Sequence, residues 1–238
     1  MAGIVDLASG CFHPVVMGKA VPHRIGVLAR YGAMALASAT LAPGGAHAAG
    51  PDYFPKSFLE PSVTCPGFPT KQVVLNEVEA GWFPRHWQAA DEPSLYAQSL
   101  SHTPSVARTY RFTWLRSFDP PVVVRIDVGA DGRMRLVAKQ LSGAGGYAPG
   151  RIAKQVRRDL SASEQARIAA VLDRTHVLES PPIACSTEIN LDGAQWIFES
   201  SEPGSYRFVN RWSPGDGPVR EAGLAFLNLT GWGFDKVY

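Results

Sequence analysis

The chain has 238 residues, of which 45% are hydrophobic, and its 23 Lys and Arg residues against 21 Asp and Glu residues give a formal net charge of +2. Residues 1–48 hold three of the basic residues and one of the acidic ones, so residues 49–238 hold 20 of each. A neutral chain of this size suits one domain and lacks the basic excess of a protein that binds nucleic acid, so we expect no nucleic-acid partner.

Residues 1–48 have the layout of a secretory signal peptide. A basic lead with Arg24 and Arg30 precedes an uncharged apolar run at residues 31–42. A helix-breaking Pro–Gly–Gly segment follows, and an Ala–His–Ala sequence then offers the small residues that signal peptidase reads. We therefore expect cleavage after Ala48 and a periplasmic or secreted protein.

A retained membrane anchor is the alternative interpretation of this segment. Arg30 makes the apolar run shorter than the about 20 residues that a membrane-spanning helix needs. This favours cleavage, with no stable membrane insertion afterwards. Met17, which is followed by Gly18 and Lys19, would give a more ordinary start to a signal peptide than Met1.

Cys65 and Cys185 are the two cysteines that remain after cleavage, because Cys11 lies in the leader. An isolated pair in an oxidising compartment usually forms a disulfide, and two free thiols are the alternative. Both cysteines lie among loop residues, so we expect a bridge that fastens the N-terminal part of the chain to the domain. The histidines and cysteines have no metal-binding spacing, and we expect neither a metal nor a cofactor.

Residues 49–108 are predicted to form an N-terminal arm that contains one helix. Residues 70–89 carry apolar side chains at helical spacing, and we expect Pro84 to end or bend that helix. Residues 90–108 are polar and typical of a loop, with a short helix at residues 92–97.

Residues 109–238 are predicted to form the main domain. Apolar and polar residues alternate over residues 109–114, 122–128 and 133–139, with a turn sequence at residues 129–132. This pattern is typical of three antiparallel strands.

The second half of the domain begins with a helix, because Ser161 and Glu164 form the sequence of a capping box. A hairpin pairing residues 195–199 with residues 205–212 follows, and Pro218 opens a last helix. The order β-β-β-α-β-β-α predicts a two-layer α+β domain with a five-stranded antiparallel sheet, preceded by the helical arm.

Charge is unevenly divided between the two faces of the predicted sheet. The even-numbered strand positions are mostly apolar or aromatic and should share the face under the helices. The odd-numbered positions carry seven cations and two anions: Arg111, Arg125, Arg133, Arg135, Lys139, Arg207 and Arg211 against Asp127 and Glu199.

Two explanations remain open for this cationic face. In the first, the arm lies across the sheet and its carboxylates neutralise the face; these are Glu77, Glu79, Asp91 and Glu92. In the second, the face is a recognition surface for an acidic protein or an anionic ligand, since the arginine fork suits carboxylate and phosphate groups. The contact residues would then be Arg111, Arg125, Lys139 and Arg211.

Catalytic motifs are scarce, because the chain has neither the G-x-S-x-G nor the S-x-x-K signature of serine nucleophiles. A hydrolase of envelope polymers would have to use Glu199 or Glu92 together with His86, and these side chains would have to converge in one cleft. The sequence favours a binding or interaction module over an enzyme. An immunity or inhibitor protein shares the same features.

Four sequence strings together resemble a group of uncharacterised bacterial secreted proteins. They are TyrArgPheThrTrpLeuArg at residues 110–116, the glycine-rich loop at residues 143–150, AspGlyAlaGlnTrpIlePheGlu at residues 192–199 and ArgTrpSerPro at residues 211–214. The resemblance covers roughly residues 78–231. It implies an exported single-domain protein and no particular activity.

Overall fold

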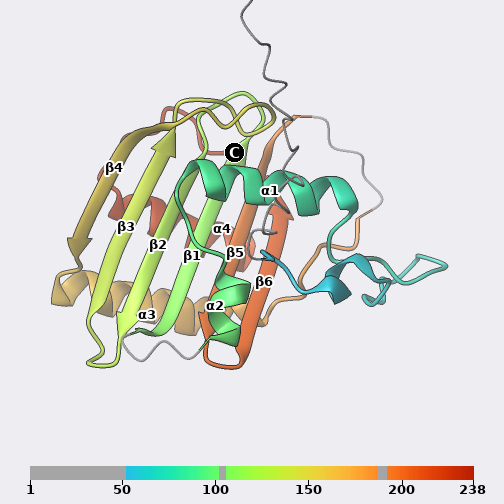
Figure 1. Ribbon diagram of the computed structural model, residues 1–238, viewed down its shortest axis with the longest axis horizontal. Helices are drawn as coiled ribbons and strands as arrows, with labels where there is room; N and C mark the ends of the chain where they lie inside the picture. Colours follow the sequence, from blue (N-terminus) through green and yellow to red (C-terminus); the bar gives the residue numbers. More distant parts are fainter. Residues whose placement is uncertain (1–51, 102–105, 187–191) are drawn as a thin grey trace, which may run out of the picture. The chain divides into compact units, whose positions relative to one another are not determined.

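The computed structural model describes residues 52–101, 106–186 and 192–238 (Figure 1). The predicted signal peptide lies outside these residues. The strands are β1 (Val106–Arg116), β2 (Val122–Gly129), β3 (Met134–Leu141), β4 (Ile152–Asp159), β5 (Ala194–Glu202) and β6 (Ser205–Trp212). The helices are α1 (Glu77–Ala89), α2 (Leu95–Leu100), α3 (Ala162–Thr175) and α4 (Gly217–Leu229), with short 3-10 helices η1 (Lys56–Leu59) and η2 (Val177–Glu179).

The predicted α+β class with an antiparallel sheet is confirmed, but the sheet has six strands, in the order β4-β3-β2-β1-β5-β6. The prediction of five strands was wrong because β4 carries only two partly buried apolar residues, Ile152 and Val156, among residues that are mostly polar and exposed. An edge strand of this kind has no buried face long enough to produce a clear alternation.

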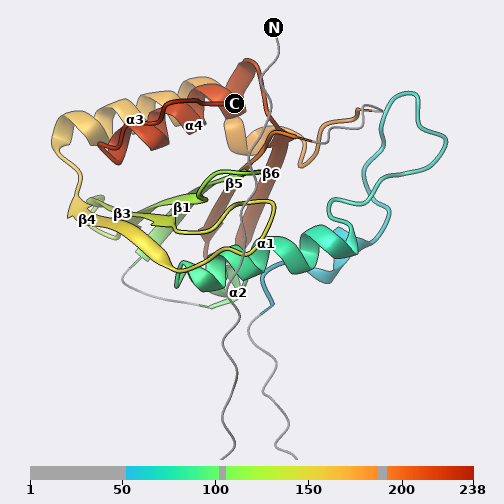
Figure 2. The same ribbon diagram turned by 90° about the horizontal axis from the view of Figure 1, so that it is seen from above.

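The prediction of two layers was also wrong. Helices α3 and α4 cover one face of the sheet, whereas α1 and α2 lie on the opposite face (Figure 2). The arm therefore adds a third layer to the domain. Within the described ranges, no helix is both long and apolar enough to cross a bilayer.

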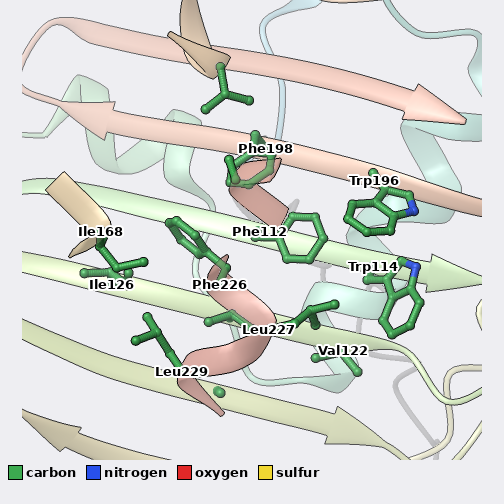
Figure 3. Packing of buried hydrophobic residues seen from close by; sticks show 14 of the residues in the cluster. Phe112, Trp114, Val122, Ile126, Ile168, Trp196, Phe198, Phe226, Leu227 and Leu229 are labelled. Atoms are coloured by element: carbon green, nitrogen blue, oxygen red, sulfur yellow. The ribbon is translucent and has the colours of Figure 1, made fainter. Parts of the chain in front are cut away.

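The face under α3 and α4 holds the larger hydrophobic core (Figure 3). Phe112 on β1 lies beside Phe198 on β5, with ring centroids 4.8 Å apart, and Phe226 of α4 packs edge-on against Phe198 at 5.3 Å. These strand residues are even-numbered, as the alternation predicts. Trp114 and Trp196 both donate their indole N–H to the backbone oxygen of Tyr238, which holds the C-terminus against the core.

The opposite face carries a second core under α1. Phe83 and Trp87 of α1 are fully buried there, against Val123, Ile197 and Phe208 of the sheet. An Asn76–Glu79 capping box begins the helix. The helix neither ends nor breaks at the predicted position, because Pro84 lies inside it.

The hairpin between β5 and β6 reverses the face on which odd-numbered residues lie. Phe198 pairs with Val209 and Ser200 pairs with Arg207, so each pair joins an even-numbered residue to an odd-numbered one. The two-residue turn between the paired residues Glu202 and Ser205 fixes this register.

This register corrects the predicted composition of the cationic face. Arg207 and Arg211 share a face with Phe198, under α3 and α4, whereas Arg111 lies on the α1 face. The prediction that all seven cations lie on one face was therefore wrong. It assumed that odd-numbered residues of neighbouring strands share a face, which holds only where odd-numbered residues pair with odd-numbered ones.

Cys65 and Cys185 form a disulfide with a Cα–Cα distance of 5.3 Å. The predicted pairing is confirmed. The bridge closes 120 positions of chain and ties the segment before α1 to the segment before β5. It thus fastens the arm to the sheet that the arm covers.

Candidate functional site

The first cluster of predicted site residues is an ion pair beneath α1. Adjacent strands place Arg111 opposite Glu199, and both are fully buried. The guanidinium donates from Nε to Oε2 at 2.7 Å and from Nη2 to Oε1 at 2.9 Å. Its Nη1 donates to the Pro93 backbone oxygen at 2.6 Å, its carbon lies 4.2 Å from the Trp87 ring centroid, and Tyr206 donates its hydroxyl to Glu199 at 2.8 Å.

The electrostatics of this pair favour the charged form of Arg111. Burial alone would lower the pKa of Arg111, but the adjacent Glu199 carboxylate outweighs it and raises that pKa above its ordinary value. Burial and the same carboxylate raise the pKa of Tyr206 well above its ordinary value. Tyr206 therefore stays protonated and serves as a hydrogen-bond donor.

A second buried cluster lies around Glu92, which follows α1. Lys139 Nζ lies 2.7 Å from Glu92 Oε1, and Arg125 Nε donates to Oε2 at 2.7 Å. Arg125 also pairs with Asp127, and Lys139 donates to the Asp91 backbone oxygen at 2.9 Å. Glu92 is one of the arm carboxylates expected to neutralise the sheet, and it pairs with both Arg125 and Lys139.

His86 lies in α1, fully buried, with Nδ1 3.1 Å from the Trp82 backbone oxygen. Burial lowers its pKa, so the ring is neutral at pH 7. Among the described residues, no hydrogen bond or ion pair joins His86 to Glu92 or Glu199. The three catalytic candidates are thus buried, and both carboxylates are committed to cations.

Arg211 lies on the other face, where it fixes a loop. Its Nη2 donates to the Pro181 backbone oxygen at 2.8 Å and its Nη1 to the Asn210 backbone oxygen at 2.7 Å. Burial lowers its pKa. Together with the burial of Arg111 and Lys139, this leaves no open cationic sheet face of the predicted kind in the part of the chain that the structure describes.

A cleft of about 750 Å³ opens on the α3 face, between the end of α3 with η2 and the sheet. We call it the α3 cleft. Its apolar part consists of Tyr110, Met134, Ala169, Ala170, Leu172, Val177 and Leu178. Its charged or titratable residues are Arg108, Asp173, His176, Glu179, Glu202 and Arg207.

Internal pairs hold some of these polar groups. Arg108 donates from Nε to Glu202 at 2.9 Å and from Nη1 to the Tyr110 hydroxyl at 3.0 Å. The hydrogen bond to Tyr110, followed by that to Glu202, raises the pKa of Arg108. His176 Nδ1 lies 3.2 Å from Glu179 Oε1 at the rim.

Asp173 and Arg207 differ from these groups, because neither has an ion-pair partner within the described ranges. Asp173 projects from α3 and Arg207 from β6, and both are exposed. The cleft thus combines an apolar lining with one uncompensated charge of each sign on its two walls. Sequence reasoning missed it because Arg207 reaches this face only through the β5–β6 register.

Comparison with protein-family models and with curated proteins gave no match. The described residues contain no group of three or more His, Cys, Asp or Glu side chains that could hold a metal ion.

Proposed function

We propose that the chain is exported and that residues 49–238 act outside the cytoplasm as a binding domain, with the α3 cleft as its ligand site. The layout of the leader supports export, and the Cys65–Cys185 bridge suits an oxidising compartment. The proposal makes no use of the sheet cations under α1, because they are paired and covered there.

The α3 cleft is the main support for a binding function. Its volume of about 750 Å³ is that of a small-molecule site, for which about 300–1,000 Å³ is usual. An apolar lining with a few convergent polar groups is the usual composition of such sites. Binding needs no nucleophile or acid–base pair, so it fits the residues present.

The ligand that best matches these walls is a short peptide with free ends and an apolar side chain. Asp173 would attract its ammonium group and Arg207 its carboxylate, to which the guanidinium can donate two hydrogen bonds. The apolar side chain would remove surface from water against Met134, Leu172 and Leu178.

An NMR titration with the tripeptide Ala-Leu-Ala tests this function. We expect amide shifts to concentrate at residues 172–179 and 200–207, and acetylated, amidated Ala-Leu-Ala to bind at least fivefold more weakly. Asp173→Asn and Arg207→Gln should each weaken binding about tenfold, the equivalent of about 1.4 kcal/mol. Arg167→Gln, an exposed charge on another part of α3, is the matched control.

Equal binding of the free and capped peptides, or no shifts in the cleft at 10 mM peptide, would overturn the ligand assignment. The export step has its own test, which is N-terminal sequencing of the native protein. A mature N-terminus just after Ala48 supports it, whereas an intact leader on a cytosolic species contradicts it.

A further inference from the structure

Strand β4 is one edge of the sheet, paired with β3 along one side only. Just beyond its end, the Leu160 N–H donates to the Met134 backbone oxygen. Hydrogen-bonded pairs alternate along an antiparallel ladder, so Arg158, Val156 and Lys154 bond to β3. The backbone groups of the intervening residues 155, 157 and 159 therefore point away from the sheet.

The side chains along this edge are uncovered. Lys154, Gln155, Arg157 and Asp159 are exposed, whereas Val156 packs against the core under α3. The helices that cover the middle of the sheet thus leave the outward backbone groups of residues 155 and 157 open within the described part of the chain, whereas the Asp159 backbone oxygen accepts a hydrogen bond from Arg158 Nη1 at 3.4 Å.

The edge is also positively charged. Arg158 pairs with Glu164, and Asp159 pairs with Arg135. Arg151, Lys154 and Arg157 have no ion-pair partner among the described residues. Lys154 and Arg157 project to opposite faces of the strand, so a segment added beside β4 would meet a cation on each face.

We propose that β4 binds an extended acidic segment of a partner protein, which adds to the sheet as a seventh strand. The outward backbone groups would supply ladder hydrogen bonds, and Lys154 and Arg157 would select Glu or Asp side chains on the added strand. This site is separate from the α3 cleft and does not depend on the function proposed for the cleft.

Charge distinguishes this occupant from a second copy of the chain. Antiparallel pairing of two β4 strands through their outward backbone groups, centred on Val156, would set Lys154 opposite Arg158 of the copy. Like charges opposite one another across strands are destabilising. Lys154, which opposes self-pairing, would also attract an acidic strand.

An NMR titration with the capped peptide Thr-Glu-Glu-Val-Glu-Glu-Thr tests the proposal, with Thr-Lys-Lys-Val-Lys-Lys-Thr as control. We expect shifts and slowed amide exchange at residues 153–159 with the Glu peptide only. Raising NaCl from 50 to 500 mM should weaken binding several-fold. No binding of the Glu peptide at 5 mM, or equal binding of both peptides, overturns the proposal.

Two modifications separate strand addition from simple charge attraction. Gln155→Pro removes an outward N–H but no cation and no bond to β3, and it should weaken binding at least tenfold. A Glu peptide that is methylated at alternate backbone nitrogens should also bind the unchanged protein at least tenfold more weakly. If both retain full affinity, the cations attract the peptide without adding a strand and the proposal fails.

Charge reversal supplies the last comparison. The double variant Lys154→Glu and Arg157→Glu should abolish binding, whereas Arg167→Glu on α3 should leave it within twofold. Equal losses in both would show a non-specific effect of net charge and contradict a site on β4.

Discussion

Arg111 and Glu199 stand opposite each other on β1 and β5 and form a two-point ion pair with no exposed surface. The pair explains how a neutral domain can carry cations in the middle of a sheet. Arg111 is matched by Glu199, and Arg125 and Lys139 are matched by Glu92 of the arm. The arm is thus part of the electrostatic structure of the sheet.

Removal of one partner should be far more harmful than removal of both. Arg111→Met leaves the Glu199 carboxylate buried without its cation, and we expect the free energy of unfolding to fall by about 3–5 kcal/mol. The double variant Arg111→Met and Glu199→Leu removes the stranded charge as well and should recover at least about 1 kcal/mol of that loss. Urea-induced unfolding measures both.

The exposed pair of Arg135 and Asp159 is the matched control, since its side chains are 63% and 69% exposed. Arg135→Met should cost less than about 1 kcal/mol. A comparable loss at both positions would contradict the role assigned to burial.

Gly223 of α4 should not tolerate a methyl group, although Ala is the better helix former. A Cβ at this position would lie 2.5 Å from the Trp196 ring and 3.0 Å from Phe112, so the helix would have to move away from the sheet. We expect Gly223→Ala to lower the free energy of unfolding by about 1–3 kcal/mol.

Gly81 in α1 provides the opposite case. A Cβ there meets nothing within 4 Å, so Gly81→Ala should raise stability by about 0.5–1 kcal/mol. Thermal unfolding of the two variants compares them directly. Stabilisation by both would mean that α4 does not approach the sheet as closely as these contacts require.

The fold class was predictable because its central elements carry strong local signals. In strands such as β1, apolar and polar residues alternate clearly along the sequence, and the Ser161–Glu164 capping box marks the start of α3. Strand β4 has only neighbouring β3 to define it, and its exposed side chains follow no period. The prediction that Pro84 ends or bends the helix failed because burial of α1 stabilises the helix by more than the loss of the hydrogen bond that proline removes.

The candidate site was less predictable, since it depends on tertiary relations. The equal numbers of acidic and basic residues in residues 49–238 already implied that the sheet cations are compensated, and Glu92 was among the expected partners. The face of Arg207 depends on a two-residue turn, and a shift of one residue there moves every β6 side chain to the other face. Sequence alternation alone does not specify that shift.

Loss of the disulfide should destabilise the domain. Cys65→Ser and Cys185→Ser should each lower the free energy of unfolding by about 2–5 kcal/mol, because the bridge restricts a long loop in the unfolded chain. The double Ser variant should lose about as much as either single variant, since one bond is lost in every case. Additive losses in urea unfolding would show that the thiols contribute separately.

The capping carboxylate of α3 predicts a specific pH dependence. Glu164 accepts hydrogen bonds from Arg158 and from the Ser161 backbone N–H, and these lower its pKa from 4.5 to about 2. A carboxyl with a lower pKa in the folded state stabilises the fold above its unfolded pKa, and this contribution is lost as the pH falls from about 4.5 toward 2.

Glu164→Gln keeps an oxygen for Ser161 but removes the charge, so at pH 7 it should cost about 1 kcal/mol for this partly exposed pair. The difference in unfolding free energy between wild type and variant should be constant from pH 7 to pH 5 and should shrink toward zero near pH 2. Urea unfolding across this range measures it. A difference that persists unchanged at pH 2 would mean that the capping geometry, and not the ionised carboxylate, stabilises the start of α3.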